Sequence, residues 1–252
     1  MRKLIAVLIF LLSFPLFLYF TFPIERFVEN SLCRQKISCK KVEVRRLPLK
    51  VELDEVKLPS LPFKFDKVIV SPQVSSLLSE EKRFNVLAKV CGGILKADAN
   101  YPVHSVKFEL EKLRVENCLK KSSLPFSISG VLFGSGTLSF KKNNLVGGSG
   151  NFKLKNLKLR KIAFGLLSLK SANIGNVKVT YKVKRRNVVD IDVQGKGKDA
   201  RLSVKGYVNL NVRRIERSYV NLRVKLTPYV EPFKGQTFSF RIKGSLENLS
   251  FK

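Results

Sequence analysis

Side chains that could perform acid–base chemistry are few and scattered in this sequence. Asp190 and Asp192 lie two residues apart in an alternating segment, a spacing that places two carboxylates on one face of a strand. Such a pair can act as general acid and base, but on a basic strand a solvated face is the simpler interpretation. The single histidine, His104, has no nucleophile or metal-binding set beside it. We therefore predict no catalytic centre, and a protein that is not an enzyme.

Two glycine-rich segments match nucleotide-binding motifs only in part. GKGKDA at residues 195–200 has the G-x-G-x-x-A spacing, but a strand pattern follows it where that motif requires a helix. GGSG at residues 147–150 lacks the Lys-Ser/Thr pair of a P-loop. We predict turn or bulge glycines at both places, with no cofactor and no metal.

The four cysteines match no zinc-binding spacing. They form two close pairs along the chain, which favours disulfides and an oxidising compartment. We predict that Cys33 pairs with Cys39 and Cys91 with Cys118, which is one of three possible connectivities. Free buried thiols are the alternative.

The first 23 residues contain an uncharged apolar stretch, residues 4–22, behind Arg2 and Lys3. At about 1.5 Å per helical residue this stretch reaches across a hydrocarbon core of about 30 Å. A cleaved signal peptide and a buried core helix are the alternatives, but no A-x-A-like cleavage site follows the stretch. The division predicted is an uncleaved membrane anchor at 1–23 and a β-rich domain at 24–252.

The orientation of this anchor rests on two opposing signals. More basic residues follow the stretch than precede it, which by the positive-inside rule would keep the body in the cytoplasm. Long domains, however, cross membranes largely regardless of charge, and the cysteine pairs suit an oxidising compartment. We therefore expect the body to lie outside the cytoplasm.

The chain is strongly basic, with Lys+Arg 48 against Asp+Glu 19 and a net charge of +29. Such a charge attracts anionic surfaces. Sheets that bind nucleic acid interleave basic residues with exposed aromatics, whereas here the aromatics share the apolar face and the cations occupy the other. We expect no nucleic acid, and anionic lipid headgroups as the partner beside a membrane. Alternatively, the lysines only keep strand edges soluble.

From Val42 onward, apolar residues recur with period two almost to the end of the chain. Turn residues at 92–93, 143–144 and 185–187 separate neighbouring alternations. Only two segments have helical character, a short amphipathic one that begins after Pro23 and residues 72–81. The fold class predicted is all-β and mainly antiparallel, with one N-terminal transmembrane helix and one short amphipathic helix.

Three segments interrupt the alternation by one extra residue, at 50–58, 107–115 and 151–160. In the last of these, Leu154 and Leu157 would point to opposite faces of a regular strand. A bulge at each place would send both apolar pairs to one concave side. The alternative at residues 155–156 is a tight turn between two strands.

The predicted strands have apolar faces that the few helices cannot cover. Burial of apolar surface gains about 25 cal/mol per Å², so these faces are not expected to stay exposed to water. The sheet either packs on itself as a sandwich or barrel, or curls into a trough whose apolar interior binds another molecule. Alternation alone leaves both solutions open. From strand parity, the residues predicted to line such an apolar groove are Val179, Tyr181, Val204, Leu222, Val224, Phe238 and Phe240.

Four stretches, FPIERFVENSLC, SGVLFGSGTLSFKKNNLVGGSGNFKLKNLKL, SYVNLRVKLTP and FRIKGSLENLSF, together resemble the type II secretion system protein N family. That family itself resembles AsmA-like membrane-anchored β proteins. In the last stretch Leu249 stands where relatives often have proline. The positions that match are Gly130, Gly134, Gly136, Gly150, Ser218, Asn221, Leu222, Gly244, Leu246 and Asn248.

The resemblance implies a non-enzymatic inner-membrane protein with a periplasmic body, an accessory component of type II secretion whose partners are parts of the secretion machine. AsmA-like relatives are thought to shield lipid acyl chains in the apolar groove of a curved sheet. The resemblance therefore implies an open, curved and twisted trough in place of a closed sandwich. The alternative function is a lipid-binding or lipid-transfer protein.

Overall fold

The computed structural model describes residues 24–58, 61, 63–76, 79–119, 126–142, 144–164, 167–212, 214–246 and 248–251. The predicted membrane anchor at 1–23 lies outside these ranges. Within them, no helix has both the length and the apolar character needed to cross a bilayer.

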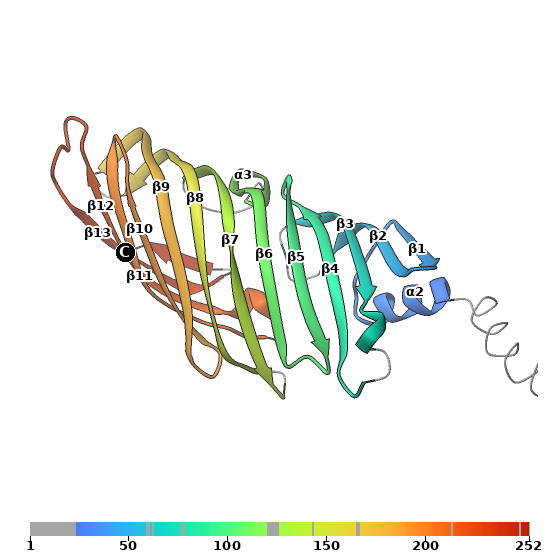
Figure 1. The fold of residues 1–252 in the computed structure, drawn as a ribbon. Coiled ribbons are helices and arrows are strands. Elements are labelled where there is room, and N and C mark those ends of the chain that lie inside the picture. Colours follow the sequence, from blue (N-terminus) through green and yellow to red (C-terminus); the bar gives the residue numbers. More distant parts are fainter. Residues whose placement is uncertain are drawn as a thin grey trace, which may run out of the picture.

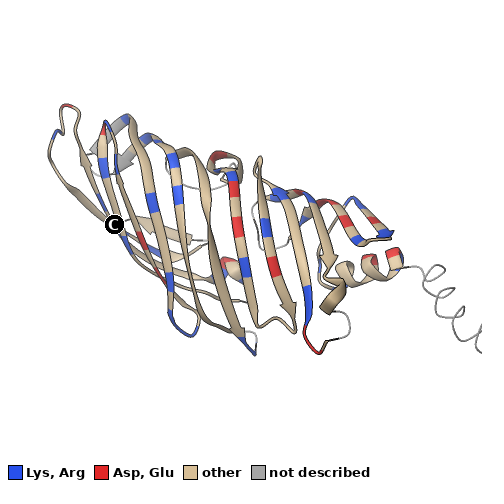
Figure 2. Ribbon diagram, viewed as in Figure 1, with Lys and Arg blue, Asp and Glu red and all other residues tan. Residues whose placement is uncertain are grey.

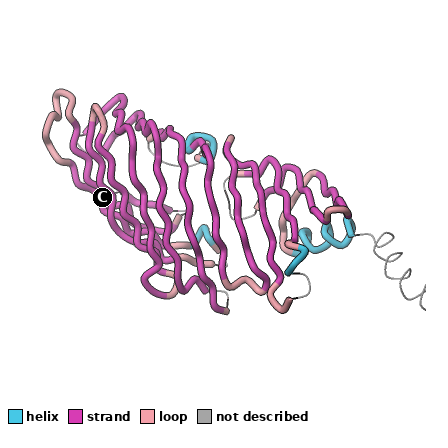
Figure 3. Tube along the Cα trace, viewed as in Figure 1, coloured by secondary structure: helices cyan, strands magenta, loops and turns pink. Residues whose placement is uncertain are grey.

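One antiparallel sheet of 14 strands makes up nearly all of the described chain (Figure 1, Figure 3). Each strand pairs with its neighbours in sequence, and β1 and β14 form the two edges. The all-β prediction is confirmed, and the alternative of two sheets packed together is wrong. The strands are β1 Lys41–Arg46, β2 Leu49–Lys57, β3 Lys64–Pro72, β4 Lys82–Val90, β5 Gly93–Tyr101, β6 Ser105–Arg114, β7 Ser127–Lys141, β8 Asn144–Phe164, β9 Leu167–Arg185, β10 Val188–Lys196, β11 Ala200–Asn209, β12 Tyr219–Pro228, β13 Phe238–Ser245 and β14 Asn248–Phe251.

The short amphipathic helix predicted after Pro23 is confirmed as α2, Ile24–Arg34, which lies beside β1 (Figure 1). Glu25 in its first turn and Arg34 in its last turn complement the helix dipole. The remaining helical elements are single turns: α3 Val115–Cys118, η1 Val74–Ser76 and η2 Ile215–Arg217.

The helix predicted at 72–81 is wrong, because β3 continues to Pro72 and the described residues after it form only the turn η1. Ser76 explains the difference. Its hydroxyl donates to the Gln73 carbonyl (2.8 Å) and accepts from the Arg83 backbone N–H (2.8 Å). A serine that bonds locally to the backbone in this way competes with helix formation.

The three interruptions of the alternation are irregularities inside continuous strands. In β8, Asn156 has a φ of 54°, and the register with β9 shifts between Leu154 and Leu157. Both leucines then contribute to the same hydrophobic cluster. Glu55 in β2 and Lys112 in β6 have φ values of 51° and 54° at the equivalent position. The bulge interpretation is therefore confirmed, and a turn at 155–156 is wrong.

The sheet is twisted and curls along its strand order, so that its C-terminal strands lie behind the central ones in Figure 1. The rings of Phe126, just before β7, and Phe251, in β14, have centroids only 6.4 Å apart although seven strand pairings separate the two strands. Bulges increase local twist and so favour such curvature.

Candidate functional site

One face of the sheet, here called the inner face, carries continuous rows of apolar residues and glycines. Cα partners on neighbouring antiparallel strands share a face, so the strand register defines each row. The first row runs from β1 to β13 through Val42, Leu53, Val68, Ala88, Leu95, Leu110, Gly134, Phe152, Val179, Val193, Val204, Val224 and Phe240.

The second row lies two residues away and crosses all the strands from β1 to β14. It comprises Val44, Val51, Val70, Val86, Ala97, Phe108, Gly136, Gly150, Tyr181, Ile191, Gly206, Leu222, Ile242 and Phe251. Neither row contains a charged residue. At about 4.8 Å per strand, the inner face offers an apolar strip roughly 60 Å long.

Three aromatic rings form the middle of this strip. Phe152 stacks between Phe108 and Tyr181, with centroid distances of 6.1 and 6.0 Å. Glycines make room for the rings: a Cβ at Gly136 would lie 2.5 Å from the Tyr181 hydroxyl, and one at Gly150 would lie 2.3 Å from Tyr181 Cε1. The Tyr181 ring therefore occupies the space that side chains at these two glycine positions would need.

The Tyr181 hydroxyl is the only polar side-chain group in the two rows, and it has a partner. It donates to the Thr137 carbonyl at 2.9 Å. Burial raises the pKa of Tyr181 above its ordinary value, so the group stays a neutral donor. The two rows therefore present hydrocarbon surface to a ligand, and no free hydrogen-bonding side chain.

Part of the inner face is covered and part keeps accessible surface. The largest cluster joins residues of β8, β9, β11 and β12, including Ile174, Val177 and Leu226, and packs against Phe233 from the loop after β12. Two smaller clusters lie around Val90 and around Leu145. By contrast, the second-row residues in β3 to β6 are half-buried and lie outside these clusters: Val70, Val86, Ala97 and Phe108.

All seven residues predicted to line a groove lie on the inner face. They are not equally accessible. Val224 is buried, Val179 and Phe238 pack against the largest cluster, and Tyr181 packs against the cluster around Leu145. Val204, Leu222 and Phe240 are half-buried.

Sequence reasoning missed the N-terminal part of the strip and the role of the glycines. Val70, Val86 and Phe108 extend the second row away from the predicted groove. The alternating glycines Gly134 and Gly136 were a usable signal, because glycine at every second strand position leaves one face bare.

Cys91 and Cys118, one of the two predicted pairs, form a disulfide that joins α3 to the turn after β4. The other predicted pair is not formed: Cys33 and Cys39 are both free and line one hollow beside α2. Burial raises the pKa of the Cys39 thiol, and Glu29 adds to the shift. The thiolate needed for disulfide exchange is therefore disfavoured there.

The acidic and histidine residues singled out in the sequence lie apart from the strip. Asp190 and Asp192 are on the opposite, outer face, where they pair with Lys184 (2.6 Å) and Lys205 (3.4 Å). His104 is exposed, and its backbone carbonyl accepts a hydrogen bond from the Phe140 N–H. Residues 195–200 form the end of β10, a turn and the start of β11, and residues 147–150 lie inside β8.

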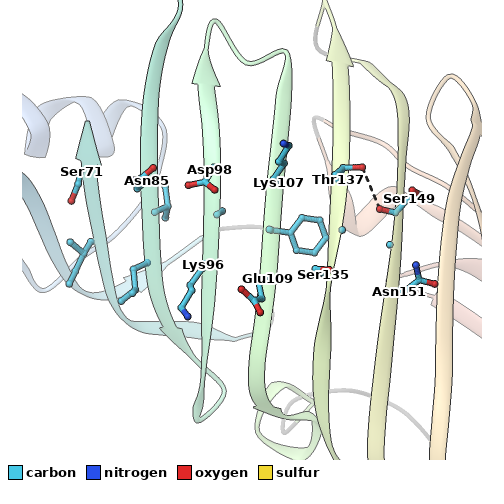
Figure 4. Close-up of a pocket in the computed structure, with 17 residues that line it drawn as sticks. Ser71, Asn85, Lys96, Asp98, Lys107, Glu109, Ser135, Thr137, Ser149 and Asn151 are labelled. Carbon is cyan, nitrogen blue, oxygen red and sulfur yellow. Dashed lines mark hydrogen bonds between the residues drawn. The ribbon is translucent and has the colours of Figure 1, made fainter. Parts of the chain in front are cut away.

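The outer face has a shallow hollow of about 660 Å³ over β3 to β8 (Figure 4). Its charges are matched across strands, since Lys96 lies opposite Glu109 and Asp98 opposite Lys107. The Thr137 hydroxyl donates to the Ser149 carbonyl at 3.5 Å. Such pairing is typical of a solvated sheet surface. Across the described ranges, no group of three His, Cys, Asp or Glu side chains is placed to hold a metal ion.

No family model matches the chain, and searches of curated proteins and of solved structures also found no significant match. Function therefore has to be inferred from the residues and their arrangement.

Proposed function

We propose that the protein binds lipid acyl chains along the inner face of its curved sheet. The observation that carries this proposal is the pair of apolar rows that cross the sheet without a charged residue. An apolar surface this extensive on one side of an open sheet is typical of a site that binds an apolar ligand or partner. We further propose, as the sequence resemblance implies, that the body lies in the periplasm and is held at the inner membrane by residues 1–23.

The chemistry of the rows agrees with a long hydrocarbon ligand. Each methylene moved from water to an apolar surface gains about 0.8 kcal/mol, so ten of them offer roughly 8 kcal/mol before entropic costs. A ligand rich in polar groups would find no partners in the rows, where the Tyr181 hydroxyl already donates to Thr137. Acyl chains need no such partners.

Photolabelling with a radiolabelled fatty acid that carries a diazirine tests the proposal on the full chain in detergent. Leu222→Asp places a carboxylate in the second row, whereas Asn221→Asp adds the same charge on the outer face of the same strand. A carboxylate against hydrocarbon costs several kcal/mol, so we expect labelling to fall roughly tenfold or more in Leu222→Asp. Asn221→Asp should label like the unaltered chain.

Circular dichroism tests whether both variants remain folded, and Leu222→Gln is a milder substitution at the same position. Equal labelling of all the variants would contradict the proposal. So would native mass spectra of the unaltered protein, purified from membranes in a mild detergent, that show no bound lipid.

A second candidate function, an accessory role in type II secretion, rests on the sequence resemblance. The matching glycines include Gly134, Gly136 and Gly150, which in this chain lie against aromatic rings. Chemical cross-linking in native membranes, followed by mass spectrometry, tests this role. Recovery of secretion-machine components supports it, and cross-links confined to lipid or to the chain itself count against it.

A further inference from the structure

The charges of the chain are distributed very unevenly along the sequence. Between Glu116 and Asp190 there is no acidic residue, while Lys and Arg recur throughout. This stretch contains β7, β8 and β9, the centre of the sheet. Figure 2 shows β8 and β9 with basic residues alone, whereas β6 carries both signs.

The N-terminal part of the outer face neutralises its basic residues with acidic ones. Glu52 contacts both Arg45 (3.4 Å) and Lys67 (2.6 Å). Glu55 contacts Lys40 and Lys64 in the same way. The fold is therefore able to pair charges on this surface where the sequence supplies both signs.

The outer face of β8 to β11 is different. A hollow of about 910 Å³ there is lined by Lys153, Lys155, Lys178, Lys196, Arg201 and Lys205. Of these, Lys205 has an acidic partner, Asp192 at 3.4 Å, and Lys155 lies over the Phe133 ring. For the other four, no carboxylate of the described chain lies within ion-pair distance.

Several of these cations also face one another directly. Lys153 is the Cα partner of Lys178. Lys196 is the partner of Arg201. Like charges opposite each other on neighbouring strands destabilise a sheet, so this arrangement costs stability unless an anion neutralises it.

We propose that this cationic hollow and the strands around it are a docking surface for the headgroup layer of an anionic phospholipid membrane. Charge complementarity carries the proposal. The sheet sets basic side chains in a regular array, and lysine is a flexible point charge that follows mobile phosphates without a fixed geometry. The proposal does not depend on the acyl-chain groove, which lies on the other face.

A nucleic acid fits this surface less well. Binding of single strands uses exposed aromatic rings on which bases stack, but none of the described residues that line this hollow is aromatic, and the nearby Phe133 ring has the Lys155 ammonium 5.0 Å from its centroid. The predicted anchor at 1–23 would also hold the protein at a membrane. Among anions, phospholipid headgroups therefore match the surface and its setting best.

Vesicle flotation tests the proposal on the full chain held in phosphatidylcholine nanodiscs, so that only the body can meet added vesicles. One variant combines Lys153→Gln, Lys178→Gln and Lys196→Gln. The control combines Lys40→Gln, Lys64→Gln and Lys96→Gln, which lowers the net charge equally but removes lysines that have acidic partners. Thermal unfolding tests whether both triple variants remain folded.

We expect the unaltered protein to float with vesicles of equal parts phosphatidylcholine and phosphatidylglycerol, and not with phosphatidylcholine alone. The hollow variant should bind roughly a hundredfold more weakly, since each basic residue near an anionic surface contributes roughly fivefold. The control should bind like the unaltered protein.

Three outcomes would overturn the proposal. The first is that the unaltered protein does not float with vesicles that contain phosphatidylglycerol. This outcome overturns the proposal even if the protein binds another polyanion, such as poly-glutamate. The second is equal binding to both kinds of vesicle. The third is an equal loss in the two triple variants, which would mean that net charge alone governs binding.

Discussion

Gly150 illustrates how single residues shape the inner face, because the ring of Tyr181 occupies the space that a side chain would need. A Cβ at Gly150 would lie 2.3 Å from Tyr181 Cε1. We expect Gly150→Ala to lower the free energy of unfolding by about 1–3 kcal/mol, as overpacking does. Urea unfolding measures the change.

Gly147→Ala is the matched control, since its nearest neighbour would be Ser139 Cβ at 3.6 Å. In a Tyr181→Leu background the cost of Gly150→Ala should shrink, because the ring that it displaces is gone. A Gly150→Ala variant as stable as the parent would contradict the stacked arrangement.

The Glu52 carboxylate is expected to make the stability of the protein depend on pH. Its hydrogen bond with Lys67 (2.6 Å) holds the pKa of the carboxyl below the ordinary value of 4.5. A group whose pKa is lowered by folding stabilises the protein above its unfolded pKa, and this contribution is lost as the pH falls through the folded pKa. We therefore expect Glu52→Gln to lower the melting temperature at neutral pH.

The difference between Glu52→Gln and the parent should close as the pH falls below 4.5. Thermal unfolding over a series from neutral to acidic buffers measures it. If the difference in melting temperature between Glu52→Gln and the parent is the same at every pH, the ionised Glu52 carboxylate does not stabilise the fold.

At the scale of elements, the bulge in β8 depends on the left-handed backbone at Asn156, with a φ of 54°. Asparagine and glycine tolerate this conformation, whereas a β-branched residue does not. We expect Asn156→Val to cost about 1–3 kcal/mol of unfolding free energy. Asn156→Gly should cost little.

Denaturant unfolding compares the two Asn156 variants directly. Equal stability of Asn156→Val and Asn156→Gly would rule out the bulge. Beyond stability, the bulge sets which face receives Leu157 and Leu159, since a shift of one residue turns a strand over.

The disulfide between Cys91 and Cys118 fixes α3 to the hairpin of β4 and β5, with a sequence separation of 27 residues. In the chain-entropy account a loop of this length stabilises the fold by about 3.5 kcal/mol. We expect the double variant Cys91→Ser, Cys118→Ser to lose roughly that amount in equilibrium unfolding. The parent in reducing buffer should behave like the double variant, and no difference between oxidised and reduced parent would contradict the bond.

At the scale of the whole molecule, repulsion among the basic residues governs the response to salt. The net charge is +29, and the C-terminal strands carry like charges in register, such as Arg223 opposite Arg241. Salt screens repulsion between exposed charges more than it affects the apolar rows. We expect the melting temperature to rise as salt is added, measured by circular dichroism in potassium fluoride. A fall would mean that the ion pairs around Glu52 and Glu55 dominate.

Much of the local structure could be predicted from residue order alone. Strand parity placed Val204, Leu222 and the other predicted groove residues on one face, because successive side chains of a strand point to opposite sides. The interruption at 151–160 predicted a bulge for the same reason. Helical spacing after Pro23 predicted α2. These features depend on neighbours in sequence, so the sequence contains them.

Other features could not be predicted from the spacing of apolar residues. Residues 72–81 do not form the predicted helix, because Ser76 bonds to Gln73 and Arg83. Cys33 and Cys39 share a hollow but remain free. Neither outcome follows from spacing.

By itself, the sequence determined that this protein is a succession of one-sided strands with separate apolar and basic faces. Only the tertiary structure decided that the strands form one open sheet, which curls until Phe126 and Phe251 meet at 6.4 Å. Alternation assigns each side chain to a face, but it does not say whether that face meets another sheet. That outcome depends on twist accumulated over many pairings, and twist is a property of the assembled sheet.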